Sequence, residues 1–199
     1  MKQIRAVILI VLGLSMILTS AWFLSRYEQE AEIAGENAQQ LLAAITHEIE
    51  QTRERDVYDT ARREQTTGQM LRTSLQGYDL VGVIRVPAVG VELPVLNSWS
   101  YQLLKLAPCR YSGSIEGQDL ILMGYNYKKH FAPLRQVSPG ERVEFLDVSG
   151  TSHAYVVAET EVLKPTQLDE LTASEYALTI FTCTPGGQSR FVVRCDPAQ

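Results

Sequence analysis

The hydrophobic pattern divides the chain into three zones, and the first predicts a membrane span. Residues 6–24 form an uncharged run of 19 residues between Arg5 and Arg26. A helix needs roughly 17–25 apolar residues to cross a bilayer, so residues 1–26 are expected to hold a signal anchor. Lys2 and Arg5 precede the run, which places the N-terminus in the cytoplasm and the rest of the chain outside. A cleaved signal peptide is the alternative, although the run exceeds the roughly 7–15 residues of its hydrophobic region.

The second zone, residues 27–76, is predicted to be a helical extracytoplasmic stalk. Residues 27–67 contain ten acidic and four basic residues and no proline. A narrow apolar stripe at helical spacing consists of Leu41, Leu42, Ile45 and Ile49. We interpret the zone as a solvated helix that holds a domain away from the membrane. A short oligomeric coiled coil is the alternative, but the stripe is too brief to establish it.

The third zone, residues 77–199, is predicted to be a mostly β domain. Short apolar runs alternate with turns that contain glycine or proline, which is typical of a sandwich or a closed barrel. The expected strands are residues 80–86, 91–96, 119–123, 142–146, 153–158, 177–182 and 190–194. Short helices are expected at 101–106 and 168–174. About 120 residues suffice for one core.

The composition narrows the function classes. The 199 residues include 18 Lys and Arg against 23 Asp and Glu, a net charge of −5. Hydrophobic residues make up 45% and charged residues 21%, which excludes a disordered, collagen-like or polytopic membrane chain. The acidic balance lacks the basic surface that nucleic acid requires, so no nucleic-acid partner is expected. Three cysteines exclude a dense disulfide scaffold.

One cysteine stands where a catalytic thiol would be accessible. Cys183 ends the β-rich run 179–182 and is followed at once by the turn residues 184–187. Arg190 begins the next expected strand, and strands joined by a short connection are usually neighbours. An adjacent cation lowers a thiol pKa, and an arginine can stabilise a developing oxyanion. The alternative is a half-buried cysteine beside a surface arginine at a hairpin.

Several motifs resemble those of the sortase family. The run TIFTC resembles the TLxTC signature of sortases, and CTPGGQSRFVVR resembles the stretch that carries their catalytic arginine. The match makes Arg190 that arginine, and its position seven residues after Cys183 is similar to class B, C and D sortases. Two further segments resemble sortase strands and loops: VGVIRVPAVGVELPVL and DLILMGYNYKKHFAPLRQVSPGERVEF.

The resemblance implies a closed eight-stranded β barrel on the outer face of a Gram-positive-type cell membrane. It implies a cysteine transpeptidase, in which Cys183 attacks a carbonyl of a C-terminal sorting signal and forms a thioester. An amine of a cell-wall precursor or a pilin lysine, or water, would resolve the thioester. Arg190 would hold the carbonyl or the oxyanion, and Thr182 would help to shape the substrate site. The resemblance implies no required cofactor or metal, although some relatives bind calcium.

Tyr125 departs from the family pattern. Gly124-Tyr125-Asn126 stands where sortases have Gly-His-Asn, so a phenol replaces the catalytic imidazole. Reference pKa values are about 10 for tyrosine and about 6.5 for histidine, so Tyr125 is a poor proton shuttle for a thiol. General acid–base catalysis contributes about 10²–10⁴-fold, and its loss predicts an impaired enzyme.

Three explanations of Tyr125 stay open at this level. The chain is a pseudo-sortase that binds sorting signals or pilus components without turnover, an active sortase that uses His130 or a water, or a natural or deliberate variant that traps substrate. His130 follows five residues after Tyr125, and the alternative is that it packs within the connecting segment. A structural membrane protein whose stalk mediates assembly is a third class of function, which leaves Cys183 and Arg190 unexplained.

Four other residues have structural alternatives. His153 is expected to be a surface residue of a strand. Cys109 and Cys195 are expected to be buried hydrophobic residues, with a disulfide between them as the alternative. Arg194 is a rival of Arg190, because residues four apart on a strand project to the same face.

Overall fold

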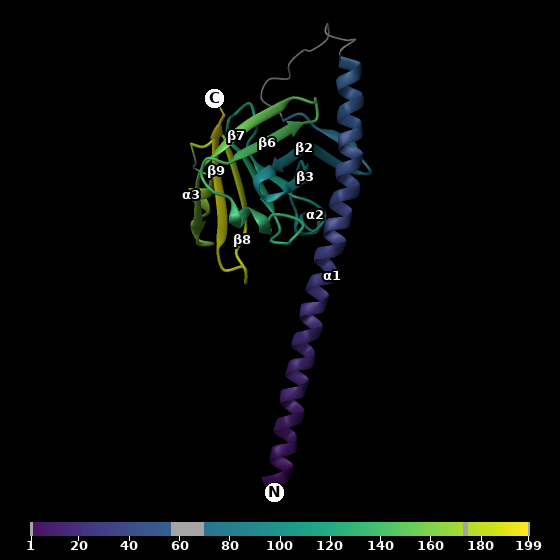
Figure 1. The fold of residues 1–199 in the computed structure, drawn as a ribbon, viewed down its shortest axis with the longest axis vertical. Coiled ribbons are helices and arrows are strands. Elements are labelled where there is room, and N and C mark those ends of the chain that lie inside the picture. Colours follow the sequence, from purple (N-terminus) through teal and green to yellow (C-terminus); the bar gives the residue numbers. More distant parts are fainter. Residues whose placement is uncertain (1, 57–69, 173–174, 199) are drawn as a thin grey trace.

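The computed structural model describes residues 2–56, 70–172 and 175–198. One continuous helix, α1 (Lys2–Asp56), contains both the apolar run and the first part of the predicted stalk. Its 55 residues correspond to about 80 Å of helix. Figure 1 shows the C-terminal half of α1 beside the barrel and the N-terminal half projecting away from it.

The remainder of the described chain forms one curved sheet that closes on itself. Its strands are β1 (Thr73–Leu75), β2 (Tyr78–Val86), β3 (Val91–Leu96), β4 (Cys109–Ser112), β5 (Leu120–Gly124), β6 (Arg142–Asp147), β7 (Ser152–Leu163), β8 (Leu178–Cys183) and β9 (Arg190–Pro197). The strand order is β1-β2-β3-β4-β5-β8-β9-β7-β6, and β6 also pairs with β2. The strands β2 to β9 therefore form the predicted closed eight-stranded barrel, and β1 extends it as a hairpin with β2.

The short helices lie in the connections between strands. The two predicted helices are confirmed as α2 (Tyr101–Leu104) and α3 (Leu168–Thr172). The 3-10 helices η1 (Pro87–Val89) and η2 (Ala132–Gln136) complete the set among the described residues. In α2 the Ser100 side chain accepts a hydrogen bond from the backbone N–H of Leu103 at 3.1 Å, which is a normal N-terminal cap.

The barrel interior is closely packed with aliphatic and aromatic side chains. Its buried members come from every strand of the closed barrel except β4 and include Ile84, Leu122, Phe145, Ile180 and Val193. Outward-facing residues form separate clusters, one under α3 and one under α1. Each strand therefore buries one face inside the barrel, and parts of its other face are covered by helices.

The expectation of a solvated stalk is wrong for the part of α1 that lies along the barrel. Leu41, Ile45 and Ile49 are buried against Leu80, Val83, Leu96, Leu104 and neighbouring residues. The stripe is apolar because it covers an apolar patch on the outside of β2, β3 and α2. The chain's own barrel thus occupies the surface that the coiled-coil alternative would have used.

Candidate active site

Cys183 and Arg190 form a direct cross-strand pair between the end of β8 and the start of β9. The antiparallel register places their Cα atoms opposite each other. Residues opposite one another share a face of the sheet, with Cβ atoms about 4.5–5.5 Å apart. Both residues are only half-buried. The predicted adjacency of the two strands is therefore confirmed, and the thiol and the guanidinium share one accessible edge.

This pair lies on the outer face of the barrel. Side chains alternate along β8: Leu178 and Ile180 enter the interior cluster, whereas Phe181 joins the outer cluster under α3. Cys183 is two residues beyond Phe181 and shares its outward direction. Figure 1 shows the β8–β9 connection at the end of the barrel from which the N-terminal half of α1 projects.

The hairpin between the two strands holds the arginine in place. Gly186 and Gly187 adopt positive φ angles of 83° and 73°, a conformation that favours glycine. The backbone N–H of Thr184 donates to Ser189 O at 2.9 Å. Nη1 of Arg190 donates to the carbonyls of Gly187 and Ser189, both at 3.1 Å. A guanidinium has five N–H donors, so others remain for a substrate oxygen.

Arg194 has a structural environment that differs from that of Arg190. It is buried and forms an ion pair with Glu161 at 2.8 Å. It also donates to Thr179 Oγ1 at 3.1 Å and to the carbonyls of two α3 residues. Arg194 therefore joins β7, β8, β9 and α3, which leaves Arg190 as the arginine beside the thiol.

Tyr125 lies next to the cysteine because β5 and β8 are parallel neighbours. Gly124 at the end of β5 pairs with Thr182 of β8. Tyr125 follows Gly124 and Cys183 follows Thr182, so these two residues are neighbours. A Cβ at Gly124 would lie 2.8 Å from Phe131 Cγ, so only glycine fits before the tyrosine. Burial is the main cause that raises the pKa of Tyr125; Lys105 opposes it, while Cys183 raises it further. The phenol is therefore protonated at neutral pH and can donate a hydrogen bond.

Aromatic rings fix the position of Tyr125. Its ring stacks on that of Tyr127, with centroids 5.0 Å apart and an interplanar angle of 29°. Tyr127 in turn meets Tyr27 of α1 edge to face at 5.7 Å. Burial raises the pKa of Tyr127 to about 12. Neither tyrosine is a proton acceptor near neutral pH.

His130 is a buried residue at the interface with α1. Its Nε2 lies 3.2 Å from the carbonyl oxygen of Ala34, and its ring is 5.5 Å from that of Tyr127. Burial lowers the pKa of His130, so the ring is neutral. This environment supports the alternative in which His130 packs, and it shows no described hydrogen bond from His130 to Cys183.

Residues 84–198, more than half of the chain, match the family model of the sortase domain. The chain belongs to the sortase family. A search among curated proteins found no match.

Solved sortase structures share this fold. Sortase C1 from Streptococcus suis is 26% identical over 60% of this chain and 73% of its own, with a TM-score of 0.53. A Clostridium perfringens sortase D5 transpeptidase is 15% identical over 82% and 99% of the two chains, with a TM-score of 0.60. Clostridium perfringens sortase C with its C-terminal cell wall sorting motif is 19% identical over 80% and 90%, with a TM-score of 0.55.

Thr182 lies on the opposite face of β8 from the thiol of this sortase. It is 1% exposed, and its Oγ1 has no hydrogen-bond partner among the described residues. Strand alternation directs it inward, beside the interior cluster. Its predicted part in shaping the site would therefore act through β8 rather than through direct contact with a substrate.

A row of aromatic side chains that the sequence did not reveal, Trp99, Tyr111 and Phe181, ends two residues before Cys183. Trp99 and Tyr101 are 42% and 72% exposed. Trp99 stacks on Tyr111 at 5.7 Å, and Tyr111 meets Phe181 edge to face at 5.4 Å. Phe181 precedes Cys183 by two residues on the same face. The close spacing of Trp99 and Tyr101 was the one available sequence signal, but it did not reveal what the rings contact.

The other two cysteines are structural. Cys109 and Cys195 are free and buried in different clusters, so the disulfide alternative is not formed. Burial raises the pKa of each thiol to about 12, and such thiols are unreactive. His153 lies on β7, as predicted, with Nε2 at 2.9 Å from Asp147 Oδ2.

Proposed function

We propose that this sortase is a membrane-anchored cysteine transpeptidase with weakened acid–base catalysis. The observation that carries the proposal is the direct pairing of Cys183 with Arg190 at the accessible end of the barrel. Its substrates would be proteins with a C-terminal sorting signal. Its acceptors would be an amine of a cell-wall precursor or a pilin lysine, or water.

The reaction divides into two acyl transfers. The Cys183 sulfur attacks the scissile carbonyl carbon, and the tetrahedral oxyanion accepts hydrogen bonds from Arg190. The C–N bond then breaks, the amine leaves with the proton that the Cys183 thiol has given up, and a thioester remains. An acceptor amine attacks the thioester, the C–S bond breaks as the new amide forms, and a proton of the acceptor returns to the Cys183 sulfur.

Tyr125 limits this cycle at the proton transfers. Its raised pKa leaves a phenol that can donate a hydrogen bond to the leaving nitrogen. It cannot take the thiol proton near neutral pH, as an imidazole can. We therefore expect acylation slower than that of a histidine-bearing form by up to about 10²–10⁴-fold.

A pseudo-sortase is the second candidate, and Tyr125 is the observation that favours it. In this form the chain binds sorting signals or pilus components without forming the thioester. The aromatic row and Arg190 would serve binding in both candidates.

Mass spectrometry of Cys183 after incubation with a panel of sorting-signal peptides tests the proposal. We expect slow acylation of the wild type, faster acylation of Tyr125→His, and none of Cys183→Ala. Peptide binding without an acyl adduct in either wild type or Tyr125→His would establish the pseudo-sortase instead. Equal loss of acylation in His130→Ala and in His130→Gln, with the fold retained, would make His130 the base.

We also propose that the N-terminal part of α1 anchors the sortase, with the barrel on the extracytoplasmic face. The helix contains an 18-residue window with a mean hydropathy of 2.2, and the apolar side chains from Ile8 to Leu24 are exposed. Digestion of the barrel by protease added to intact protoplasts would support this orientation, and protection of the barrel would contradict it.

A further inference from the structure

The turns of α1 that follow the proposed membrane span, Tyr27 to Gly35, contact the segment that carries Tyr125. Tyr27 Oη donates to Asn126 O at 3.2 Å, and its ring meets Tyr127. Glu32 forms an ion pair with Lys129. Glu30 forms another with Lys105, at 3.2 Å. These contacts join residues that are 75 to 99 positions apart in the chain.

His130 makes the buried contact of this interface. It is fully buried, and a neutral ring with its proton on Nε2 donates to Ala34 O at 3.2 Å. This carbonyl is part of the helix backbone, so the bond requires the helix and the segment to lie in one relative position. Nδ1 has no partner among the described residues, so Nε2 is the atom that holds the ring in this orientation.

Gly35 permits the close approach of the two elements. A Cβ at this position would lie 2.8 Å from Lys129 Cβ, which is closer than side chains pack. Glycine inside a helix lowers helix stability by about 1 kcal/mol relative to alanine. The close contact with Lys129 explains why a glycine stands at this position. By contrast, a Cβ at Gly13 of the same helix would meet nothing within 4 Å.

We infer that the turns of α1 from Tyr27 to Gly35 are a positioning element of the active site, and that His130 is the positioning residue. The helix holds segment 125–131, and the Tyr125–Tyr127 stack passes this constraint to the residue beside Cys183. The same helix enters the proposed membrane span directly before Tyr27. The continuous helix therefore holds the active site at a set distance and orientation from the proposed membrane span, which a flexible linker would not do. Its catalytic consequence rests on the proposed function.

The first test compares Gly35→Leu with Gly13→Leu in the full chain in detergent micelles. The readouts are amide hydrogen exchange of residues 125–132 and the acylation rate of Cys183 as a function of peptide concentration. We expect Gly35→Leu to accelerate exchange of the His130, Phe131 and Ala132 amides about tenfold. It should lower the maximal acylation rate more than it changes the half-saturating peptide concentration. Gly13→Leu should match the wild type in both.

A second pair of variants separates positioning from folding. His130→Ala should loosen the same amides, and His130→Gln should restore part of the protection, because its side-chain amide can donate to Ala34 O. Exchange in the β8–β9 strands should not change in either variant. Unchanged exchange in both Gly35→Leu and His130→Ala would overturn the inference. If the wild type forms no acyl adduct, the proposed function fails, but the exchange readout still decides the positioning role.

Discussion

At the residue scale, the two arginines of β9 show how the environment assigns a role. Arg190 and Arg194 have the same side chain, face and strand. Arg190 is half-buried at a hairpin, with carbonyl partners within its own turn. Arg194 is buried in an ion pair and bonds to three other elements. Position along the strand therefore separates the residue available to a substrate from the one that stabilises the fold.

This contrast predicts opposite effects of two substitutions. Arg190→Ala should lower acylation of Cys183 by about 10²–10³-fold, as loss of an oxyanion donor does, with little change in stability. Arg194→Ala should lower the free energy of unfolding by about 1–3 kcal/mol, because it removes the hydrogen bonds of the buried guanidinium to Thr179 and to two α3 carbonyls. Acylation assays of both variants measure the loss of activity, and denaturant titrations measure the loss of stability. Equal stability losses in the two would contradict it.

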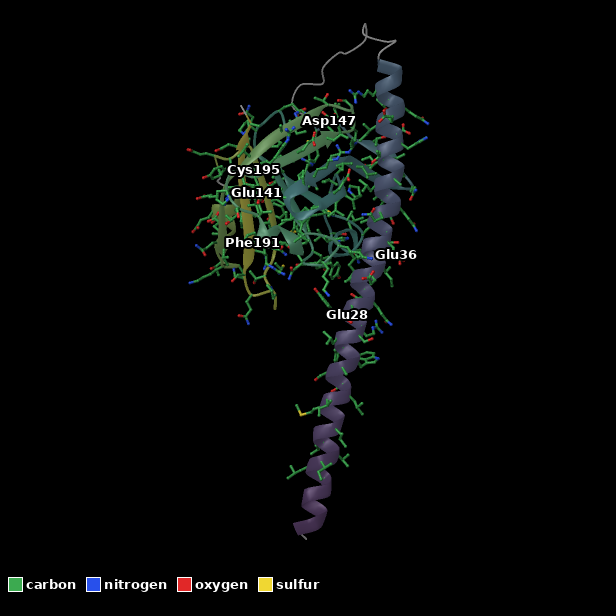
Figure 2. All side chains as sticks on the ribbon, viewed as in Figure 1. Glu28, Glu36, Glu141, Asp147, Phe191 and Cys195 are labelled. Atoms are coloured by element: carbon green, nitrogen blue, oxygen red, sulfur yellow. The ribbon has the colours of Figure 1, made fainter. Side chains whose placement is uncertain are left out.

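At the element scale, α1 behaves as part of the barrel's outer layer along half its length. Its stripe is covered by β2, β3 and α2, whereas its N-terminal half has no such cover among the described residues. In Figure 2 the Glu36 label lies beside the barrel, and the Glu28 label lies near the level of its lower end. The strand β8 has a similar dual character, since its interior face builds the core and its outer face presents the thiol.

The stripe predicts a measurable contribution to stability. Ile45 is fully buried, so Ile45→Ala should lower the free energy of unfolding by about 2–5 kcal/mol through lost burial and a residual cavity. Ile33 is 57% exposed on the same helix, and Ile33→Ala should stay within about 0.5 kcal/mol of the wild type. Chemical denaturation of the full chain measures both. A small effect of Ile45→Ala would mean that the helix does not dock in solution.

At the scale of the whole molecule, α1 and the barrel are joined by the apolar stripe of the helix and by the buried His130. His130 has a pKa below its unfolded value of about 6.5 because it is buried. Between those two pKa values the unfolded chain binds a proton that the folded chain does not. Above pH 6.5 His130 does not lower the free energy of unfolding. As the pH falls below about 6.5, protonation of the unfolded chain lowers the free energy of unfolding.

This linkage predicts a specific acid sensitivity. Between the two pKa values of His130, the wild type should lose up to about 1.4 kcal/mol of unfolding free energy per pH unit relative to His130→Gln. Denaturant titrations at a series of pH values measure the difference between the two proteins, in which the contributions of the residues common to both cancel. Parallel pH profiles of the two proteins would contradict a neutral, buried His130.

Much of the barrel followed from local sequence pattern. The runs that became β2, β3, β6 and β9 are short apolar segments next to turn residues, and β6 also alternates between buried and more exposed positions. β4 was missed because its four residues, Cys109–Ser112, show no apolar alternation and pair with β3 at a single position. β7 continues to Leu163, beyond the predicted end at Ala158, and its register with β9 shifts between Val157 and Glu159, where the polar residues begin.

The sequence by itself predicted the apolar run, the β domain and the neighbouring positions of Cys183 and Arg190, and it predicted Tyr125 at the position of the family's histidine. These features depend on neighbouring residues or on motifs that a short segment contains. Only the tertiary structure decided that the helical stripe lies on the barrel, that His130 bonds to Ala34, and that Trp99 and Tyr111 lead to Phe181. Those contacts join residues far apart in the chain, and a local pattern records that a face is apolar or polar but not which surface will cover it.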